Sequence, residues 1–261
     1  MARQLLIYER AVPLSSQRHA GWSIRATQRY GVARDVNSLP VMATEIPAAA
    51  RDHAIVFAGQ DLPMPAVILG ARDGQNLYLD DNDGWRVSYV PAFLRRYPFV
   101  FANTAEGKAF TLCIDETYDG CNQNGEGERL FDSTGERTQY LQNVINFVQK
   151  YQVEFERTKQ FCERLKSLDL LAPVQISLKV GSGQQIGLAG VQAVNREKLK
   201  ALQPDVVHDL LKSDALELIY VHLNSLANLQ RLAQWAGGQA SGGGNGIDLS
   251  RPSDEPSFDS I

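Results

Sequence analysis

The sequence VQISLKVGSGQQIGLAGVQAV, residues 174–194, is patterned as a β-hairpin. From Val174 to Val180, apolar side chains alternate with polar ones, so that one face of a strand would be apolar. Gly181-Ser182-Gly183 suits a tight turn, and a second run of strand-like residues returns after it. This stretch predicts two antiparallel strands, and the flanking segments indicate what covers them.

Helical periodicity precedes the hairpin. Ser133, with Glu136 three residues later, fits a capping box at the start of a helix. Apolar residues then recur every three or four positions as far as about Leu168; they are Leu141, Val144, Ile145, Val148, Phe155, Cys162 and Leu165. The pattern predicts one long amphipathic helix, either continuous or kinked near its middle.

Further helices are predicted after the hairpin. Asn195 and Ser213 each fit the N-cap position of a helix. The helix after Ser213 would carry one apolar stripe, made of Leu216, Ile219, Leu223, Leu226, Leu229 and Leu232. We expect this stripe to pack against the sheet or against the long helix.

Short strands separated by turns are predicted in the N-terminal half. The runs are rich in β-branched and aromatic residues and comprise AIVFA (54–58), PAVILG (65–70), NLYL (76–79), PFVFA (98–102) and FTLCI (110–114). Residues 72–74 and 82–84 have the composition of hairpin turns. A mostly antiparallel sheet in this half, followed by long helices and a hairpin, predicts an α+β fold.

Composition excludes several classes of protein. The chain has 261 residues, of which 44% are hydrophobic and 21% charged, so it is neither collagen-like nor disordered throughout. The formal net charge is −4, and we expect no nucleic-acid partner because no basic excess is present.

A change in composition near Gly237 predicts the domain boundary. Residues 237–261 are rich in Gly, Ser, Asp and Pro and predict a flexible tail, whereas residues 1–236 predict a single domain. The tail has four acidic residues and one basic residue. The domain therefore has 26 acidic and 25 basic residues and is nearly neutral.

Cellular location and redox state are also suggested by the sequence. The N-terminal apolar run is too short for a secretory leader, and no stretch is apolar enough to span a membrane, so we expect a cytoplasmic protein. Cys113, Cys121 and Cys162 are too few and too irregularly spaced for a disulfide framework or a zinc site. The odd number of cysteines favours free thiols, and a bridge between Cys113 and Cys121 across a loop is the alternative.

Tests for metal, cofactor and nucleophile motifs predict none of these sites. Residues 80–84 (DDNDG) resemble a calcium loop but lack ligands at the required positions, and a polar turn is the better interpretation. Residues 243–248 match a single calcium-binding repeat, where stacked copies are needed. The histidines have no metal-ligand spacing, and no nucleophile elbow, phosphate loop or dinucleotide fingerprint is present.

The densest candidate contact region is YVPAFLRRYPFVF, residues 89–101. Arg95, Arg96 and Tyr97 would present two guanidinium groups and a phenol before Pro98. Arginine pairs with carboxylates, so Asp115 and Glu116 across the sheet are the favoured partners, and an anionic ligand is the alternative.

Three other residues have a functional and a structural interpretation. His19, with Trp22 nearby, would form a surface contact site or hold the N-terminal arm in place. Cys113, near Asp115 and Glu116, would be a nucleophile or, as we favour, an inert core residue. His222 lies on an apolar helical face and is expected to be buried.

Several segments in fixed order carry a resemblance to a known family. They include PLSSQRHAGWSI, VNSLPVMATEIPAAARDHAIVF, VILGARDGQNLYLD, YVPAFLRRYPFVF, LCIDE and LIYVHLNSLANLQRLAQW. Over about residues 12–235 the chain closely resembles the bacterial SapC family, named for an S-layer-associated protein. The resemblance implies a surface-layer or envelope role without established catalytic residues. Relatives encoded beside TonB-dependent receptors and halogenase-like flavoproteins imply a link to peptide or nutrient uptake.

These observations predict a non-enzymatic binding or assembly protein of the bacterial envelope, with no cofactor. Its partner would be an envelope or surface-layer protein or a peptide-like ligand, bound by His19, Trp22, Arg95, Arg96, Tyr97, Asp115 and Glu116. The alternatives are an enzyme acting on amino acids or peptides through a His, Cys and carboxylate site, and a subunit of a surface lattice. Export by a leaderless route to the cell surface is the alternative location.

Overall fold

A six-stranded antiparallel sheet contains strands from both halves of the chain. The computed structural model describes residues 6–103, 110–180, 184–237 and 247–250. In the order β12-β10-β11-β4-β5-β3, the strands are Ile247–Ser250, Leu171–Val180, Gln184–Val194, Ile55–Ala58, Met64–Ile68 and Ser38–Pro40. The two halves join where Val191 pairs with Ala58 and Gln192 with Phe57. The hairpin from the C-terminal half thus extends the sheet from the N-terminal half.

The β10–β11 hairpin is as predicted. Leu171 pairs with Val194 at one end, and a register shift lies between Val174 and Ile176. Ile176 is fully buried, as the alternating pattern requires. The predicted turn at residues 181–183 lies outside the described residues. Of the predicted tail, Ile247–Ser250 form β12 against β10, and residues 238–246 and 251–261 also lie outside the description.

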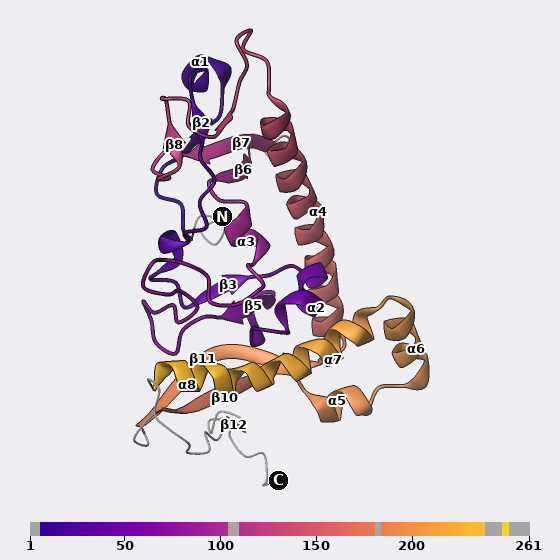
Figure 1. Ribbon diagram of the computed structural model, residues 1–261. Coiled ribbons are helices and arrows are strands. Elements are labelled where there is room, and N and C mark those ends of the chain that lie inside the picture. The colour runs from indigo at the N-terminus through magenta and orange to yellow at the C-terminus, as the bar shows by residue number, and fades with distance from the viewer. Residues whose placement is uncertain (1–5, 104–109, 181–183, 238–246, 251–261) are drawn as a thin grey trace.

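Two smaller sheets form the other end of the molecule (Figure 1). One has the order β1-β7-β6, with strands Ala11–Pro13, Phe110–Asp115 and Phe99–Asn103, and the other has the order β8-β2-β9, with strands Cys121–Asn122, Ser23–Ile24 and Glu128–Arg129. Strands β6 and β7 confirm the strands predicted at PFVFA and FTLCI, and β4 and β5 confirm those predicted at AIVFA and PAVILG. All pairings are antiparallel, as expected for this half.

The strand predicted at residues 76–79 is wrong. Asn76 is buried, its amide donates to the carbonyl oxygen of Ala33, and its side-chain oxygen accepts from the amide of Tyr78. These side-chain bonds hold the segment in a turn instead of a ladder. Only Leu79 forms a bridge, with Trp85. Between them, Asp80 accepts from the amides of Asn82 and Gly84, which confirms a polar turn.

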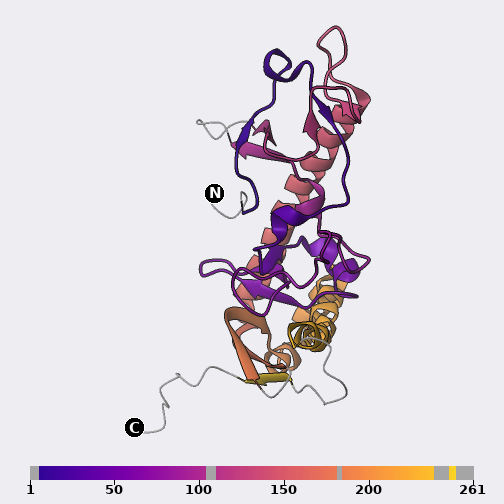
Figure 2. The same cartoon turned by 60° about the vertical axis from the view of Figure 1, so that its left-hand side comes forward.

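The long helix α4, Gln139–Ser167, is continuous and spans both ends of the molecule (Figures 1 and 2). Its N-cap is Thr138, whose hydroxyl accepts from the amide of Leu141. The predicted capping box at Ser133 and Glu136 is wrong. The Asp132 carboxylate accepts a hydrogen bond from the backbone amide of Glu136, and this bond closes a separate turn before the helix. Leu141 is buried in the core beside the small sheets, and Leu165 in a core of the opposite end.

The C-terminal helices follow the hairpin, and the last of them lie along the large sheet (Figure 1). They are α5 (Arg196–Lys200), α6 (Pro204–Lys212), α7 (Ala215–Ser225), the short 3-10 helix η4 (Leu226–Asn228) and α8 (Leu229–Ala236). Asn195 caps α5 as predicted. Ser213 does not cap α7, because it ends α6 and its hydroxyl donates to the carbonyl oxygen of Asp209. The predicted last helix is interrupted at η4, where the Asn228 amide donates to the carbonyl oxygens of Ala50 and His53.

Short helices join the remaining strands. They are α1 (Ser16–His19), η2 (Gly31–Ala33), η3 (Ala43–Glu45), α2 (Ile46–Ala49) and α3 (Ala92–Arg95). In the described part of the chain, no helix combines the length and apolar character that crossing a bilayer requires.

Candidate functional site

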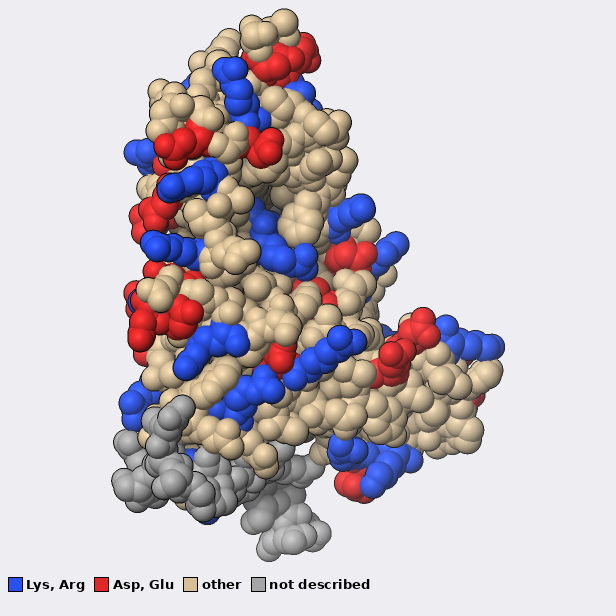
Figure 3. Space-filling view, in the orientation of Figure 1, with Lys and Arg blue, Asp and Glu red and all other residues tan. Residues whose placement is uncertain are grey.

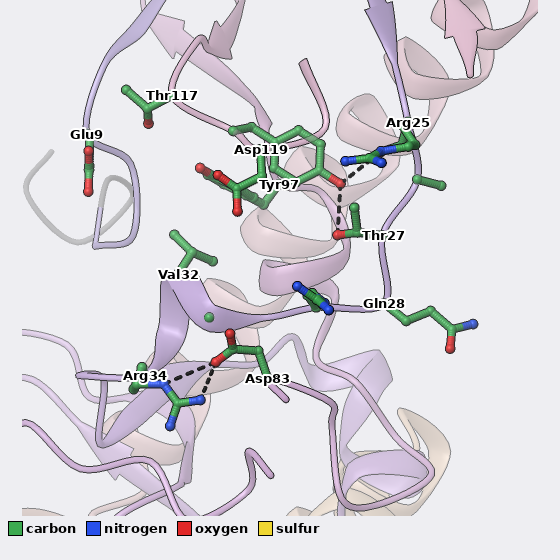
Figure 4. A pocket seen from close by; sticks show the side chains of 14 residues that line it. Glu9, Arg25, Thr27, Gln28, Val32, Arg34, Asp83, Tyr97, Thr117 and Asp119 are labelled. Atoms are coloured by element: carbon green, nitrogen blue, oxygen red, sulfur yellow. Dashed lines mark hydrogen bonds and ion pairs between the residues drawn. The ribbon is translucent and has the colours of Figure 1, made fainter. Parts of the chain in front are cut away.

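A cleft of about 1000 Å³ lies between the small sheets and the N-terminal strands of the large sheet (Figure 4). Its walls come from five segments far apart in sequence: Glu9, the strap 25–34 between β2 and β3, Asp83, Tyr97 after α3, and the turn 117–119 after β7. Positively and negatively charged side chains are interspersed over the visible face instead of forming one patch (Figure 3).

The floor of the cleft is fixed by Asp83. Its carboxylate pairs with the Arg34 guanidinium, and its carbonyl oxygen accepts from the amide of Tyr30 at 2.8 Å. Asp83 has a φ of 64°, a left-handed conformation that aspartate tolerates in turns. A Cβ on Gly31 would lie 2.8 Å from the Asp83 carboxylate, so a larger residue at position 31 would displace that carboxylate.

Tyrosine side chains line the opposite wall. The Tyr118 and Thr27 hydroxyls lie 3.3 Å apart, and Tyr118 also donates to the carbonyl oxygen of Arg25. Tyr97 packs edge to face on Tyr118, with ring centroids 5.4 Å apart. Burial, assisted by the charge of Asp115, raises the pKa of Tyr97 above its usual value. Tyr97 is therefore a neutral phenol at physiological pH.

Glu45 holds the helix that positions Tyr97. Its buried carboxylate accepts from the Ala92 amide at 2.7 Å, the Tyr89 hydroxyl at 2.7 Å and the Met42 amide at 2.8 Å. Because Ala92 is the first residue of α3, the charge also favours the helix N-terminus. Tyr97 follows this anchored helix directly.

Charged side chains of both signs line the cleft, and several have no protein partner. Arg25 lies 3.8 Å from Glu126, but both are more than half exposed, so the pair contributes little. Within the described residues, the side chains of Arg29, Glu9 and Asp119 form no hydrogen bond or ion pair. All three are exposed. Counted over the part of the chain that the structure describes, the cleft thus offers one free cation and two free anions.

Of the predicted binding residues, Tyr97 alone lines this cleft. Arg96 is only 4% exposed, with its guanidinium 4.5 Å from the ring centroids of both Phe93 and Tyr151. Arg95 donates to the carbonyl oxygen of Val90 and lies over the rings of Tyr89 and Phe147. The favoured pairing of these arginines with Asp115 and Glu116 is wrong, because the two carboxylates have other partners.

Asp115 and Glu116 bind the N-terminal segment. Fully buried Asp115 accepts from the backbone amides of Glu9 at 2.7 Å and Arg10 at 3.2 Å. Glu116 forms a two-pronged ion pair with Arg18 and a single one with Arg10. The Arg18 hydrogen bonds, with the nearby positive charges, hold the pKa of Glu116 below its usual value. Both carboxylates are thereby committed to protein contacts.

His19 and Trp22 lie beside Glu116. The His19 ring is fully buried, with Nε2 3.3 Å from the Glu116 carboxylate and Nδ1 3.2 Å from the Ser15 carbonyl oxygen. Trp22 meets the ring edge to face at 5.1 Å. Burial lowers the pKa of His19, so the neutral form is favoured. These contacts hold the N-terminal arm against β7, and their burial does not support a surface role.

The cysteines and His222 are buried or partly buried. All three thiols are free, and burial raises the pKa of Cys113 and brings those of Cys121 and Cys162 to about 12. Burial lowers the pKa of His222 to about 4, and its Nε2 accepts from the Val194 amide, which confirms the expected core histidine. Among the described residues, no three His, Cys, Asp or Glu side chains are grouped to hold a metal ion.

The cleft residues Glu9, Arg29, Tyr118 and Asp119 were not predicted. Each is isolated in sequence, and only the fold brings the four near one another. No spacing or periodicity marks such a set. The one available signal is that residues 25–29 (RATQR) combine two arginines with polar residues in a segment lacking strand or helix periodicity.

The fold and the cleft define a mixed α+β protein with a large polar cleft between its sheets. The SapC family model matches residues 14–232, most of the chain, and the protein belongs to the SapC family. No match was found among curated proteins or among solved structures.

Proposed function

We propose that the protein is a non-enzymatic binding protein of the bacterial envelope that holds a polar ligand in the cleft between its sheets. The observation that carries the proposal is the cleft of about 1000 Å³, whose lining includes the charged side chains of Glu9, Arg29 and Asp119, which have no partner among the described residues. Its volume is at the upper end of the range for small-molecule sites. Ligand binding is favoured because these exposed charges come from several segments and surround the same cleft.

The chemistry of the thiols favours binding over the enzymatic alternative. A cysteine nucleophile needs its thiolate, whereas burial raises the pKa of all three cysteines. Cys113 is 4% exposed, and its thiol donates to the carbonyl oxygen of Thr111. Neither His19 nor a cysteine lines the cleft. The groups proposed for catalysis are therefore separated from the space available to a substrate.

Membership of the SapC family supports the envelope part of the proposal. The family resemblance implies a surface-layer or envelope setting and a link to peptide or nutrient uptake. A protein that captures a small polar molecule fits this setting without catalysis. Cell fractionation of the full chain, with and without residues 238–261, tests the location and the role of the tail in reaching it.

The ligand-binding proposal is tested by filling the cleft. Ala26 is exposed on the cleft wall, and Ala26→Trp would occupy the cleft; Ala201→Trp, at an exposed alanine elsewhere, is the matched control. The melting temperature is measured with four classes of compound: amino acids, tripeptides, sugar acids and inorganic phosphate. A ligand at about 100 times its dissociation constant stabilises by about 2.7 kcal/mol, or about 5–10 °C for a domain of this size.

We expect at least one class to raise the melting temperature of the wild type and of Ala201→Trp, but not of Ala26→Trp. An equal shift in Ala26→Trp would place the ligand elsewhere and contradict the proposal. The lack of any shift with all four classes would also contradict it.

A further inference from the structure

We infer that the cleft ligand is a short peptide with both termini free, its carboxylate bound by Arg29 and its ammonium group bound by Glu9 and Asp119. This inference rests on the proposed function and names the ligand class. It follows from which cleft charges are already neutralised, where the remaining charges lie, and how large the cleft is.

Internal pairing removes some of the charges in the cleft. Arg34 and Asp83 neutralise each other on the floor, and Arg34 also donates to the carbonyl oxygen of Asp80. Arg25 has only the weak, exposed contact with Glu126. The groups that remain without a partner in the described residues are the cation of Arg29 and the anions of Glu9 and Asp119.

Free charges of both signs favour a ligand that also carries both. A purely anionic ligand would bind Arg29 but would be repelled by Glu9 and Asp119. A purely cationic ligand would meet the opposite conflict at Arg29 and Arg25. A zwitterion satisfies both sets of groups, because its two charged ends can bind different walls.

Glu9 and the strap that carries the arginines lie on different sides of the cleft. Figure 4 shows Glu9 on one side of the cleft and Arg25 on the other, with Asp119 and Tyr97 between them. Arg29 belongs to the same strap as Arg25, and its backbone pairs with Gly84 next to the floor. The carboxylate end of the ligand is thus assigned to the strap, and the ammonium end to Glu9 and Asp119.

The size and lining of the cleft favour a peptide over a single amino acid. About 1000 Å³ is far more than one amino acid fills, and several residues would occupy it better. Thr27, Gln28 and Thr117 line the cleft and have polar side chains suited to backbone amides and carbonyls. The neighbouring rings of Tyr97 and Tyr118 offer a surface for a central side chain.

The test uses a mixture of Ala-Xaa-Ala tripeptides in three forms: with free termini, N-acetylated, and C-amidated. Melting temperature is measured against tripeptide concentration. We expect the free form to stabilise the wild type, and each blocked form to need at least tenfold higher concentration for the same shift, since each block removes one charge.

Variants assign each terminus to its side chains. In Arg29→Gln, the free and amidated tripeptides should stabilise the protein at the same concentration, because the side chain that binds the carboxylate is gone. The acetylated tripeptide should still need a higher concentration than the free one. The double variant Glu9→Gln, Asp119→Asn should do the reverse. Arg157→Gln and Glu163→Gln, at exposed positions on α4 away from the cleft, are the matched controls and should keep both differences.

The inference is overturned if blocking either terminus leaves the shift unchanged, if the variants do not exchange the two preferences, or if no tripeptide form stabilises the protein. Stabilisation by sugar acids or phosphate alone, lost in Ala26→Trp, would overturn the peptide assignment but leave the proposed binding function intact. A tripeptide shift that persists in Ala26→Trp would contradict the proposed function itself.

Discussion

Arg95 and Arg96 are adjacent in sequence but have different surroundings. Arg95 reaches the surface and lies over Tyr89 and Phe147, whereas Arg96 is enclosed by Tyr8, Phe93 and Tyr151. A guanidinium among aromatic faces gains cation–π attraction and packing along its whole stem. At the scale of the residue, Arg96 therefore stabilises the fold, and Arg95 is the more replaceable of the two.

We predict that Arg96→Ala lowers the free energy of unfolding by about 3 kcal/mol, and Arg95→Ala by less than about 1 kcal/mol. The larger loss combines a cavity among three rings with the removal of a buried cation. Urea unfolding of the two single variants measures both values. Equal losses would contradict the assignment of Arg96 to the core.

Buried histidines predict sensitivity to acid. Burial lowers the pKa of His53 and His222 to about 4, against about 6.5 in the unfolded chain. Above about pH 6.5 both histidines are neutral in the folded and in the unfolded protein, so they contribute no pH dependence to the free energy of unfolding there. As the pH falls from about 6.5 to about 4, the unfolded chain binds protons first, and stability is lost by up to about 3 kcal/mol per histidine.

Two measurements check this prediction. Urea unfolding at steps between pH 7 and pH 4 should show the loss beginning near pH 6.5. Imidazole NMR signals of His53 and His222 should remain those of the neutral ring at pH 5. Protonation of either ring above pH 6 in the folded protein would refute the explanation by burial.

At the scale of the element, α4 begins where a single side chain closes its first turn. The Thr138 hydroxyl accepts from the Leu141 amide, while Asp132 bonds the amides of Thr134 and Glu136 in a separate turn. Within seven residues, two successive turns are therefore each closed by a side-chain oxygen that accepts from a backbone amide. Only the second one leads into the helix.

We predict that Thr138→Ala lowers the free energy of unfolding by about 1 kcal/mol, the usual cost of losing an N-cap. Ser133→Ala is the matched control and should change it by less than about 0.5 kcal/mol, because Ser133 caps no helix. Thermal unfolding followed by circular dichroism measures both. A larger loss for Ser133→Ala would restore the predicted capping box.

Elements with strong local patterns could be predicted from the sequence. The alternation in residues 174–194 and the spacing from Leu141 to Leu165 identified the hairpin and the long helix. Residues 76–79 were predicted wrongly because the Asn76 side chain bonds the backbone and competes with strand pairing. The cleft was not predicted because Glu9, Arg29 and Asp119 are far apart in sequence, and only the tertiary fold brings them to the same cleft.

At the scale of the whole molecule, one helix belongs to more than one hydrophobic core. Leu141, Ile145 and Val148 of α4 pack with Phe99 and Ile114 from the small sheets. Cys162 and Leu165 pack with Phe57 of the large sheet and with residues from the C-terminal helices. Helix α4 therefore connects the core beside the small sheets with a core at the opposite end of the molecule.

We predict that Leu141→Ala and Leu165→Ala, at opposite ends of α4, each lower stability by 2–5 kcal/mol in a single unfolding transition. Native-state hydrogen exchange provides the readout. Either variant should accelerate global exchange in β6 and β7 and in β4 and β5 by the same factor. Acceleration confined to the sheet near the substituted leucine would show that the two ends unfold independently.

The pairing of β4 with β11 also constrains how the chain is synthesised. More than 120 residues separate Phe57 from its partner Gln192, so the ribosome produces β4 long before that edge can be covered. Until β11 emerges, the nascent chain exposes an unpaired strand of buried apolar residues, which invites association with other chains. Fragments that end before residue 184 should therefore accumulate as aggregates in cells, and chaperones that shield strand edges should act on this protein during translation.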